Sequence, residues 1–191
     1  MEQKYDPEQV EQIARHYQAI IELLGEDITR QGLEKTPIRA AKALLENTRG
    51  YKQQPDLIAQ SAIFDHPGSE MVIVRDIEFH SLCEHHILPF FGTASIGYIP
   101  NGSIIGLSKL ARIVDAFARR FQVQERLTKE ICETIDQQLN PLGVIVVCRA
   151  QHLCMQMRGV EKQNAYTITT HYSGKFSDLA LRQEFMQLIS R

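Results

Sequence analysis

The chain has 191 residues, of which 43% are hydrophobic and 23% charged, and it contains no tryptophan. This is the composition of a globular protein with one main domain, and it excludes disordered and collagen-like chains. The 21 basic and 23 acidic side chains give a formal net charge of −2, so the chain lacks the broad positive field of proteins that bind nucleic acid or anionic membranes.

Nothing in the sequence predicts export or membrane insertion. The first residues, MEQKYDPEQVEQ, lack the basic start and apolar run of a signal peptide. No apolar stretch approaches the ~18 residues of a membrane span, so we expect a cytoplasmic protein. Its four cysteines, at positions 83, 132, 148 and 154, would stay reduced there, which favours metal binding or catalysis over disulfides.

Residues 1–50 are predicted to form an N-terminal helical unit. Asp6 is the expected N-cap of an amphipathic helix over 6–24, in which a proline occupies the first turn. A second helix is expected over 36–48, again with a proline near its start. Residues 51–70 show no sustained periodicity and contain two prolines, which indicates a connecting loop.

Residues 71–191 are predicted to form an α+β catalytic domain. Apolar, β-branched and alternating segments predict strands over 71–79, 90–99, 143–154 and 165–172. Helical periodicity predicts two helices between the strand pairs and one after them, at 107–121, 127–139 and near 181–189. This order is typical of an antiparallel four-stranded sheet with helices on one face.

The stretch SLCEHHILPF, residues 81–90, brings a thiol, a carboxylate and two imidazoles together in four positions. Cys83 and His86 have the C-x-x-H spacing with which a tight turn directs two side chains at one metal ion. An incidental arrangement of these residues is the alternative. The rings of adjacent histidines diverge, so His85 and His86 are not expected to bind one ion together.

The second half of a metal site is predicted in QHLC, residues 151–154. In a strand, His152 and Cys154 lie two residues apart and point to the same face. Cys154 as a small buried hydrophobic residue is the alternative. A catalytic zinc ion keeps three protein ligands and one water, so Cys154 would complete a set with Cys83 and His86. The neighbouring histidines would then be available to carry protons.

An anion site is predicted at the start of the helix over 107–121. Three polar side chains share one side of that helix, namely Ser108, Lys109 and Arg112. The N-terminal amides of a helix also attract phosphate. A solvated basic face is the alternative, but Arg158, shortly after QHLC, adds a cation and favours a polyanionic substrate. Glu125 begins the next helix, where physics alone indicates a partner of the helix dipole.

Several motifs occur together and in one order: SLCEHHILPFFG, YIPNGSIIGLSKLARIVDAFARR, VQERLT and QHLCMQMRG. With KTPIRAAK at its start, the chain closely resembles GTP cyclohydrolase I over residues 35–175. The resemblance implies hydrolytic opening of the guanine ring of GTP, release of C8 as formate and formation of 7,8-dihydroneopterin triphosphate, the first step of tetrahydrofolate and pterin biosynthesis. It also implies the tunnelling fold, in which antiparallel sheets join around a ring, and a homodecamer with active sites at subunit interfaces.

The resemblance further implies roles for individual residues. Zn²⁺ would be the cofactor, with a water in its fourth position and three protein ligands, Cys83, His86 and Cys154. Protons at the imidazole ring nitrogen and the ribose ring oxygen would be handled by His85 and His152, and the later sugar rearrangement would be assisted by Ser108. The guanine edge would be read by Glu125 and Gln124. The triphosphate would be held by Arg39, Lys109, Arg112 and Arg158.

The sequence departs from the family pattern at Thr93, Ser95, Phe121 and the pair Gln163–Asn164. These positions bear on affinity, interface detail or regulation, and none is an expected ligand or proton carrier. Glu84 has no expected role, because as a fourth ligand it would displace the water. Two other functions stay open: a divergent paralogue that binds a purine or pterin with partial or different chemistry, and a non-catalytic ring subunit stabilised by zinc.

Overall fold

The computed structural model describes residues 5–190, and the chain divides between Arg49 and Gly50 into two compact units. In the first unit, α1 (Pro7–Leu23) begins as predicted, because the Asp6 side chain accepts a hydrogen bond from the backbone N–H of Glu8 at 3.0 Å. α2 (Thr36–Asn47) packs against α1 through a small buried cluster of Val10, Ala14 and Ala41. The two predicted helices are therefore confirmed.

The second unit begins with the segment 51–70, for which the prediction of a loop without regular structure was wrong. It contains the second half of a short 3₁₀ helix, η1 (Arg49–Lys52), followed by α3 (Pro55–Gln60) and β1 (Ile63–Asp65). Pro55 begins α3 instead of interrupting structure, since the first turn of a helix needs no hydrogen bond from that nitrogen. β1 pairs antiparallel with β4 (Ser103–Ile105), about forty residues further along the chain, so no local pattern predicts it.

The main sheet has five strands in the order β5-β2-β3-β6-β7. The four predicted strands are present as β2 (Val72–Cys83), β3 (Pro89–Ile99), β6 (Gly143–His152) and β7 (Thr167–Tyr172), each antiparallel to its neighbours among them. A fifth, two-residue strand, β5 (Phe121–Gln122), runs parallel to the end of β2. β5 lies where the helix over 107–121 was expected to end.

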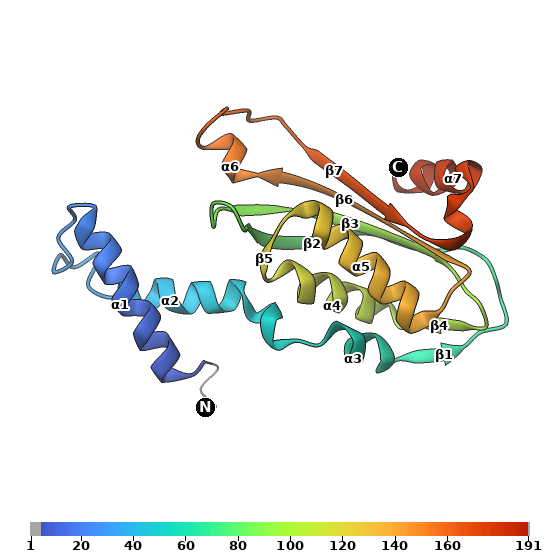
Figure 1. The fold of residues 1–191 in the computed structure, drawn as a ribbon, viewed down its shortest axis with the longest axis horizontal. Coiled ribbons are helices and arrows are strands. Elements are labelled where there is room, and N and C mark those ends of the chain that lie inside the picture. The colour runs from blue at the N-terminus through green and yellow to red at the C-terminus, as the bar shows by residue number, and fades with distance from the viewer. Residues whose placement is uncertain (1–4, 191) are drawn as a thin grey trace. The chain divides into compact units, whose positions relative to one another are not determined.

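Helices cover both faces of this sheet, although the sequence pattern predicted helices on one face (Figure 1). α4 (Leu107–Ala118) and α5 (Gln124–Leu139) pack over the larger core, which includes Val144, Val146 and Cys148 of β6. The alternate residues Ile145 and Val147 face the other way and pack near Phe176 and Phe185, in η2 (Gly174–Ser177) and α7 (Leu179–Ile189). A continuous apolar strand such as GVIVV needs cover on both sides.

β6 ends at His152, and the chain turns at once into a short helix, α6 (Leu153–Gln156). The prediction that the strand continues to residue 154 was therefore wrong. Across the sheet, His152 pairs with Phe90 at the start of β3. The end of β6 thus lies beside the loop that joins β2 to β3, and this places QHLC next to SLCEHHILPF.

Candidate metal centre

The loop between β2 and β3, residues 84–88, is a tight turn held by its own backbone. The N–H of Ile87 donates to the carbonyl of Cys83 at 2.8 Å, and the N–H of Cys83 donates to the carbonyl of Leu88 at 2.9 Å. Ile87 adopts the left-handed region with φ of 55°, which is rare for a β-branched residue. This bend allows the side chains of Cys83 and His86, which flank Glu84 and His85, to converge.

The turn and the start of α6 bring together Cys83, His86 and Cys154, whose ligand atoms all lie within 4.8 Å of one another. Cys83 Sγ is 3.7 Å from His86 Nδ1. Burial, followed by the neighbouring Cys83 thiol, raises the pKa of Cys154. The three side chains can hold a metal ion, and all four cysteines of the chain are free. Cys154 lies in the cluster because the chain leaves β6 and forms α6 at this point. The alternation of side chains along a strand did not predict this placement.

His85 lies beside this cluster with a different orientation. The rings of His85 and His86 are nearly perpendicular, at 84°, with centroids 6.1 Å apart. His85 is largely exposed, with 64% of its side chain accessible, and its Nδ1 is 3.9 Å from Cys83 Sγ. The divergence of the two rings agrees with the expectation that only one of the adjacent histidines joins the metal ligands.

His152 ends β6, two residues before Cys154, and its ring is held by two contacts. Its ring stacks on Phe90 with centroids 4.7 Å apart and an interplanar angle of 1°. Its Nε2 is 2.8 Å from Oε1 of Gln124, the first residue of α5. Burial lowers the pKa of His152, and the nearby negative charge of Glu125 opposes that shift.

Glu84 binds Arg126 of α5, although sequence reasoning found no role for it. Its carboxylate forms a hydrogen-bonded ion pair with Nη2 of Arg126, and its backbone N–H donates to the carbonyl of Gln122 at 3.0 Å. Arg126 also donates through Nε to Oε1 of Gln122 at 2.9 Å. The Arg126 hydrogen bond lowers the pKa of Glu84. The acid inside the metal-ligand motif thus ties the loop to the start of α5.

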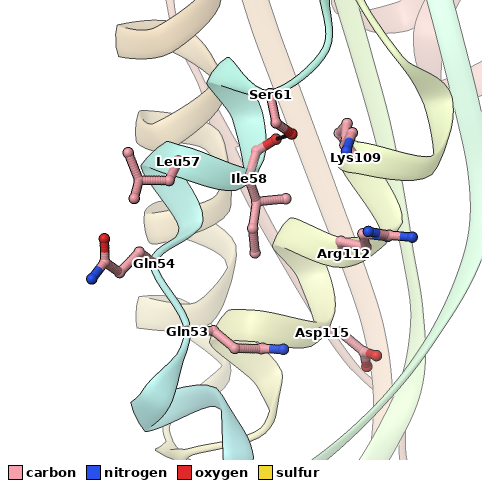
Figure 2. Close-up of a pocket in the computed structure, with 8 residues that line it drawn as sticks. All are labelled: Gln53, Gln54, Leu57, Ile58, Ser61, Lys109, Arg112 and Asp115. Atoms are coloured by element: carbon pink, nitrogen blue, oxygen red, sulfur yellow. Dashed lines mark hydrogen bonds between the residues drawn. The ribbon is translucent and has the colours of Figure 1, made fainter.

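The predicted cations divide into separate groups. Nη1 of Arg158 lies 3.1 Å from Nε2 of His86, so this cation is part of the metal centre. Lys109 and Arg112 line a pocket of about 420 Å³ between α4 and α3. Figure 2 shows them along α4 with Asp115, opposite Ile58 and Ser61 of the α3 segment. Arg39 lies exposed on α2 in the other unit.

Ser108 and Lys109 occupy the end of α4 remote from the metal centre. The last turn of α4 precedes β5, which pairs with Leu82 and Cys83, whereas its first turn follows β4 (Figure 1). A helix of 12 residues is ~18 Å long at ~1.5 Å per residue. Within one chain, the structure therefore gathers Cys83, His86 and Cys154 but leaves Ser108 and Lys109 apart from them, with Arg112 at the middle of α4.

The model of the family described as GTP cyclohydrolase I matches residues 13–190. The chain belongs to the GTP cyclohydrolase I family. A protein named GTP cyclohydrolase 1 from Porphyromonas gingivalis is 58% identical over 179 residues, which is 94% of this chain and 93% of that protein. The protein of the same name from Bacteroides fragilis is 57% identical over 180 residues, which is 94% of this chain and 93% of that protein. The protein named GTP cyclohydrolase 1 1 from Pseudomonas aeruginosa is 54% identical over 180 residues, which is 94% of this chain and 97% of that protein.

The match to GTP cyclohydrolase I covers every element of the catalytic unit, from η1 to α7, so both halves of the Cys-His-Cys cluster fall inside it. The resemblance inferred from the four motifs is confirmed. Between residues 5 and 190, none of the helices combines the length and apolar character needed to cross a membrane.

Proposed function

We propose that the protein catalyses the zinc-dependent hydrolytic opening of the guanine ring of GTP, with release of formate and formation of 7,8-dihydroneopterin triphosphate. The observation that carries this proposal is the convergence of Cys83, His86 and Cys154 within 4.8 Å, in a chain of the GTP cyclohydrolase I family. The reaction would be the first step of tetrahydrofolate and pterin biosynthesis.

The donor set suits zinc. Two thiols and one imidazole are ligands that Zn²⁺ takes in tetrahedral sites, and three protein ligands leave one position open, as in catalytic centres. When bound, zinc supplies the Lewis acidity that activates a water molecule for hydrolysis. The nearby guanidinium of Arg158 would hold negative charge of the substrate at the same place.

Two histidines would carry the protons of the reaction. His85 is exposed beside Cys83, and we assign it protonation of the imidazole ring nitrogen as C8 is attacked. His152 is half-buried, stacked on Phe90, and we assign it the proton at the ribose ring oxygen. Imidazole suits both tasks because it exchanges protons close to neutral pH.

The substrate would be held from both ends. The exposed carboxylate of Glu125, close to His152, can accept hydrogen bonds from N1 and the exocyclic amine of guanine. Gln124 lies next to it at the start of α5, with its side chain buried. The triphosphate would be held by Arg39, Lys109, Arg112 and Arg158, and Ser108 at the start of α4 would assist the sugar rearrangement.

We propose that a second copy of the chain completes the site. One chain separates Lys109 from its metal centre by most of the length of α4, so the triphosphate of a GTP at that centre would meet the α4 cations of another subunit. Such a heterologous contact repeats around a closed ring. It fits the expected tunnelling-fold decamer, in which sheets of neighbouring subunits join. We place this enzyme in the cytoplasm, where thiol ligands stay reduced.

The experiment that tests the function measures two products from purified protein incubated with GTP. We expect formate and the fluorescent oxidised pterin in equal amounts, and their formation should stop after zinc chelation and return with added Zn²⁺. Pterin without stoichiometric formate would indicate different chemistry within the fold. If the protein shows no turnover of GTP and zinc chelation dissociates its subunits, the metal has a structural role instead.

A further inference from the structure

Gln124 is the first residue of α5, and its side chain is almost completely buried, with 1% exposed. Its amide nitrogen donates toward three acceptors on the last two strands of the sheet. These are the carbonyl of Cys148 at 3.0 Å, the carbonyl of Thr167 at 3.0 Å and Oγ1 of Thr169 at 3.1 Å. The side chain therefore faces the protein interior and not the open side of the site.

These partners allow only one orientation of the Gln124 amide. Backbone carbonyls accept hydrogen bonds and cannot donate them, so the nitrogen must face Cys148 and Thr167. The amide oxygen must then face His152, whose Nε2 is 2.8 Å away. Reversing the amide would put its oxygen against two carbonyl oxygens and leave buried acceptors without donors, which is costly.

Two threonines reinforce this orientation. Oγ1 of Thr128 donates to the backbone carbonyl of Gln124 at 2.8 Å, and the hydroxyls of Thr128 and Thr169 are 2.6 Å apart. Because the Thr128 hydrogen is already engaged, Thr169 is the donor between the two hydroxyls. Oγ1 of Thr169 then accepts from the Gln124 amide. The contacts of this network therefore have one consistent direction, with the two amide hydrogens of Gln124 shared among three acceptors.

The fixed amide determines which nitrogen of His152 carries hydrogen. The oxygen of Gln124 can only accept, so Nε2 of His152 must be the donor. A neutral imidazole with hydrogen on Nε2 has none on Nδ1. Stacking on Phe90 at 4.7 Å holds the ring plane. Within that plane, a 180° flip of the ring would put Cε1 in place of Nε2 and lose the hydrogen bond to Gln124.

We propose that Gln124 is a positioning residue that holds His152 in one ring orientation and in the Nε2–H form, leaving Nδ1 as the nitrogen that meets the substrate. This inference rests on the proposed function, in which His152 handles the ribose proton. It gives Gln124 a task other than reading guanine, because both ends of its amide already have partners in the protein. Base recognition is then left to Glu125.

The first test needs no variant. Zinc-loaded protein labelled with ¹⁵N-histidine is studied by magic-angle-spinning NMR at about pH 8.5, where a histidine ring is neutral. The His152 signals are identified by their loss in His152→Asn. We expect a directly bonded hydrogen on Nε2 and an unprotonated Nδ1. A hydrogen on Nδ1 overturns the proposal whether or not the protein turns over GTP.

The second test separates positioning from recognition by kinetics. Gln124→Met keeps the length of the side chain and removes its hydrogen bonds. We expect kcat to fall about 10- to 100-fold, as for other partners that orient a site histidine, with KM for GTP changed less than about threefold. A large rise in KM with unchanged kcat would assign Gln124 to guanine recognition instead. No change in either constant also overturns the proposal.

Thr134→Val is the matched control, because Thr134 is a buried threonine on the same helix outside this network. It should leave kcat, KM and the His152 spectrum close to wild type. Gln124→Met should keep its zinc content and assembly state while losing the exclusive Nε2–H signal. If wild-type protein shows the Nε2–H form but does not convert GTP, the proposed function fails while the hydrogen-bonding role stands.

Discussion

Four consecutive residues, Cys83 to His86, occupy one tight turn and point in different directions. Cys83 and His86 converge with Cys154, His85 extends into solvent, and Glu84 binds Arg126. Neighbouring side chains on a turn cannot share one target because their Cβ directions diverge. The crowded motif is therefore one half of a metal centre with a candidate acid and an anchoring carboxylate between its ligands.

His85→Ala should abolish turnover without removing the metal. His85 stands outside the convergent trio, and loss of a proton-transferring side chain typically costs about 10²- to 10⁴-fold in rate. Zinc content by elemental analysis and formate release from GTP are the measurements. His80→Ala, a change at another exposed histidine on β2, should leave both near wild type. Loss of zinc from His85→Ala would show that our division of roles is wrong.

The four thiols should fall into two classes of reactivity. Burial raises the pKa of Cys148 to about 11 and that of Cys132 to about 12, so at pH 8 roughly one Cys148 thiol in a thousand is the reactive thiolate. After zinc chelation, a thiol reagent at pH 8 should modify Cys83 and Cys154 only. Cys132 and Cys148 should react faster as the pH rises, because the fraction of each thiol in the thiolate form increases until the pH passes its raised pKa.

Mass mapping of the modified peptides checks the thiol prediction. Before chelation, zinc should protect Cys83 and Cys154 as well. Their ligand atoms lie within 4.8 Å, so prolonged oxidation of the metal-free protein should join them in a disulfide, for which close approach is required. Rapid labelling of Cys148 in folded protein would contradict the burial described here.

At the scale of elements, the β2–β3 loop depends on α5 for its position. Glu84 and Arg126 form the link, and the backbone of Glu84 adds a second contact to Gln122. α5 in turn carries Gln124, which contacts β6 and β7. One helix start therefore connects both halves of the metal centre, which local sequence patterns did not indicate.

Glu84→Gln should weaken zinc binding without changing the ligands. Loss of the ion pair with Arg126 loosens the loop, and partners that orient metal ligands typically contribute about 10- to 100-fold in affinity. Competition with a chromogenic chelator measures the change. Glu78→Gln alters an exposed glutamate on β2, the strand that precedes the loop, and should have no effect. Equal affinities in the two variants would show that the Glu84 link does not position the loop.

α7 should be as important for stability as the helices on the other face. Phe185 is fully buried, and its ring packs where a side chain at Gly97 would clash, at 2.7 Å from the added Cβ. Phe185→Ala should lower the free energy of unfolding by about 3–5 kcal/mol. Urea unfolding followed by circular dichroism at one protein concentration gives this value. Phe64→Ala, at a 58% exposed side chain, should change it by less than about 1 kcal/mol.

In the molecule as a whole, the unit over residues 50–190 carries two candidate parts of one site. One end carries the Cys-His-Cys cluster and Arg158, and the other carries Ser108 and Lys109 at the start of α4. A substrate with a purine at one end and a triphosphate at the other can use both only if two chains contribute. Assembly would then be a condition of catalysis and not only of stability.

Mixing two inactive variants tests this arrangement. Cys83→Ser removes the metal half and Lys109→Ala the cation half, so reassembled equimolar mixtures should recover about one quarter of the wild-type activity, the share of interfaces with both halves intact. Cys83→Ser mixed with Cys154→Ser lacks the same half in every chain and should recover nothing. Equal results in the two mixtures would contradict a site shared between subunits.

Local patterns in the sequence predicted the family, the longer helices of both units (α1, α2, α4, α5 and α7), the four main strands and the two short motifs that supply the candidate metal ligands. These features follow from local signals: a capping aspartate at residue 6, apolar periodicity in α4 and α5, and C-x-x-H spacing on a turn. Their physical causes lie within a few residues of one another, so the order of residues is enough to predict them.

How distant groups meet could be read from the three-dimensional structure alone. It placed Cys154 at the metal centre by way of α6, paired β1 with β4, put α7 on the opposite face of the sheet, and turned Gln124 inward toward His152. Each of these contacts joins segments far apart in the chain. Such contacts depend on packing and on the pairing of every buried donor with an acceptor, which no local spacing encodes.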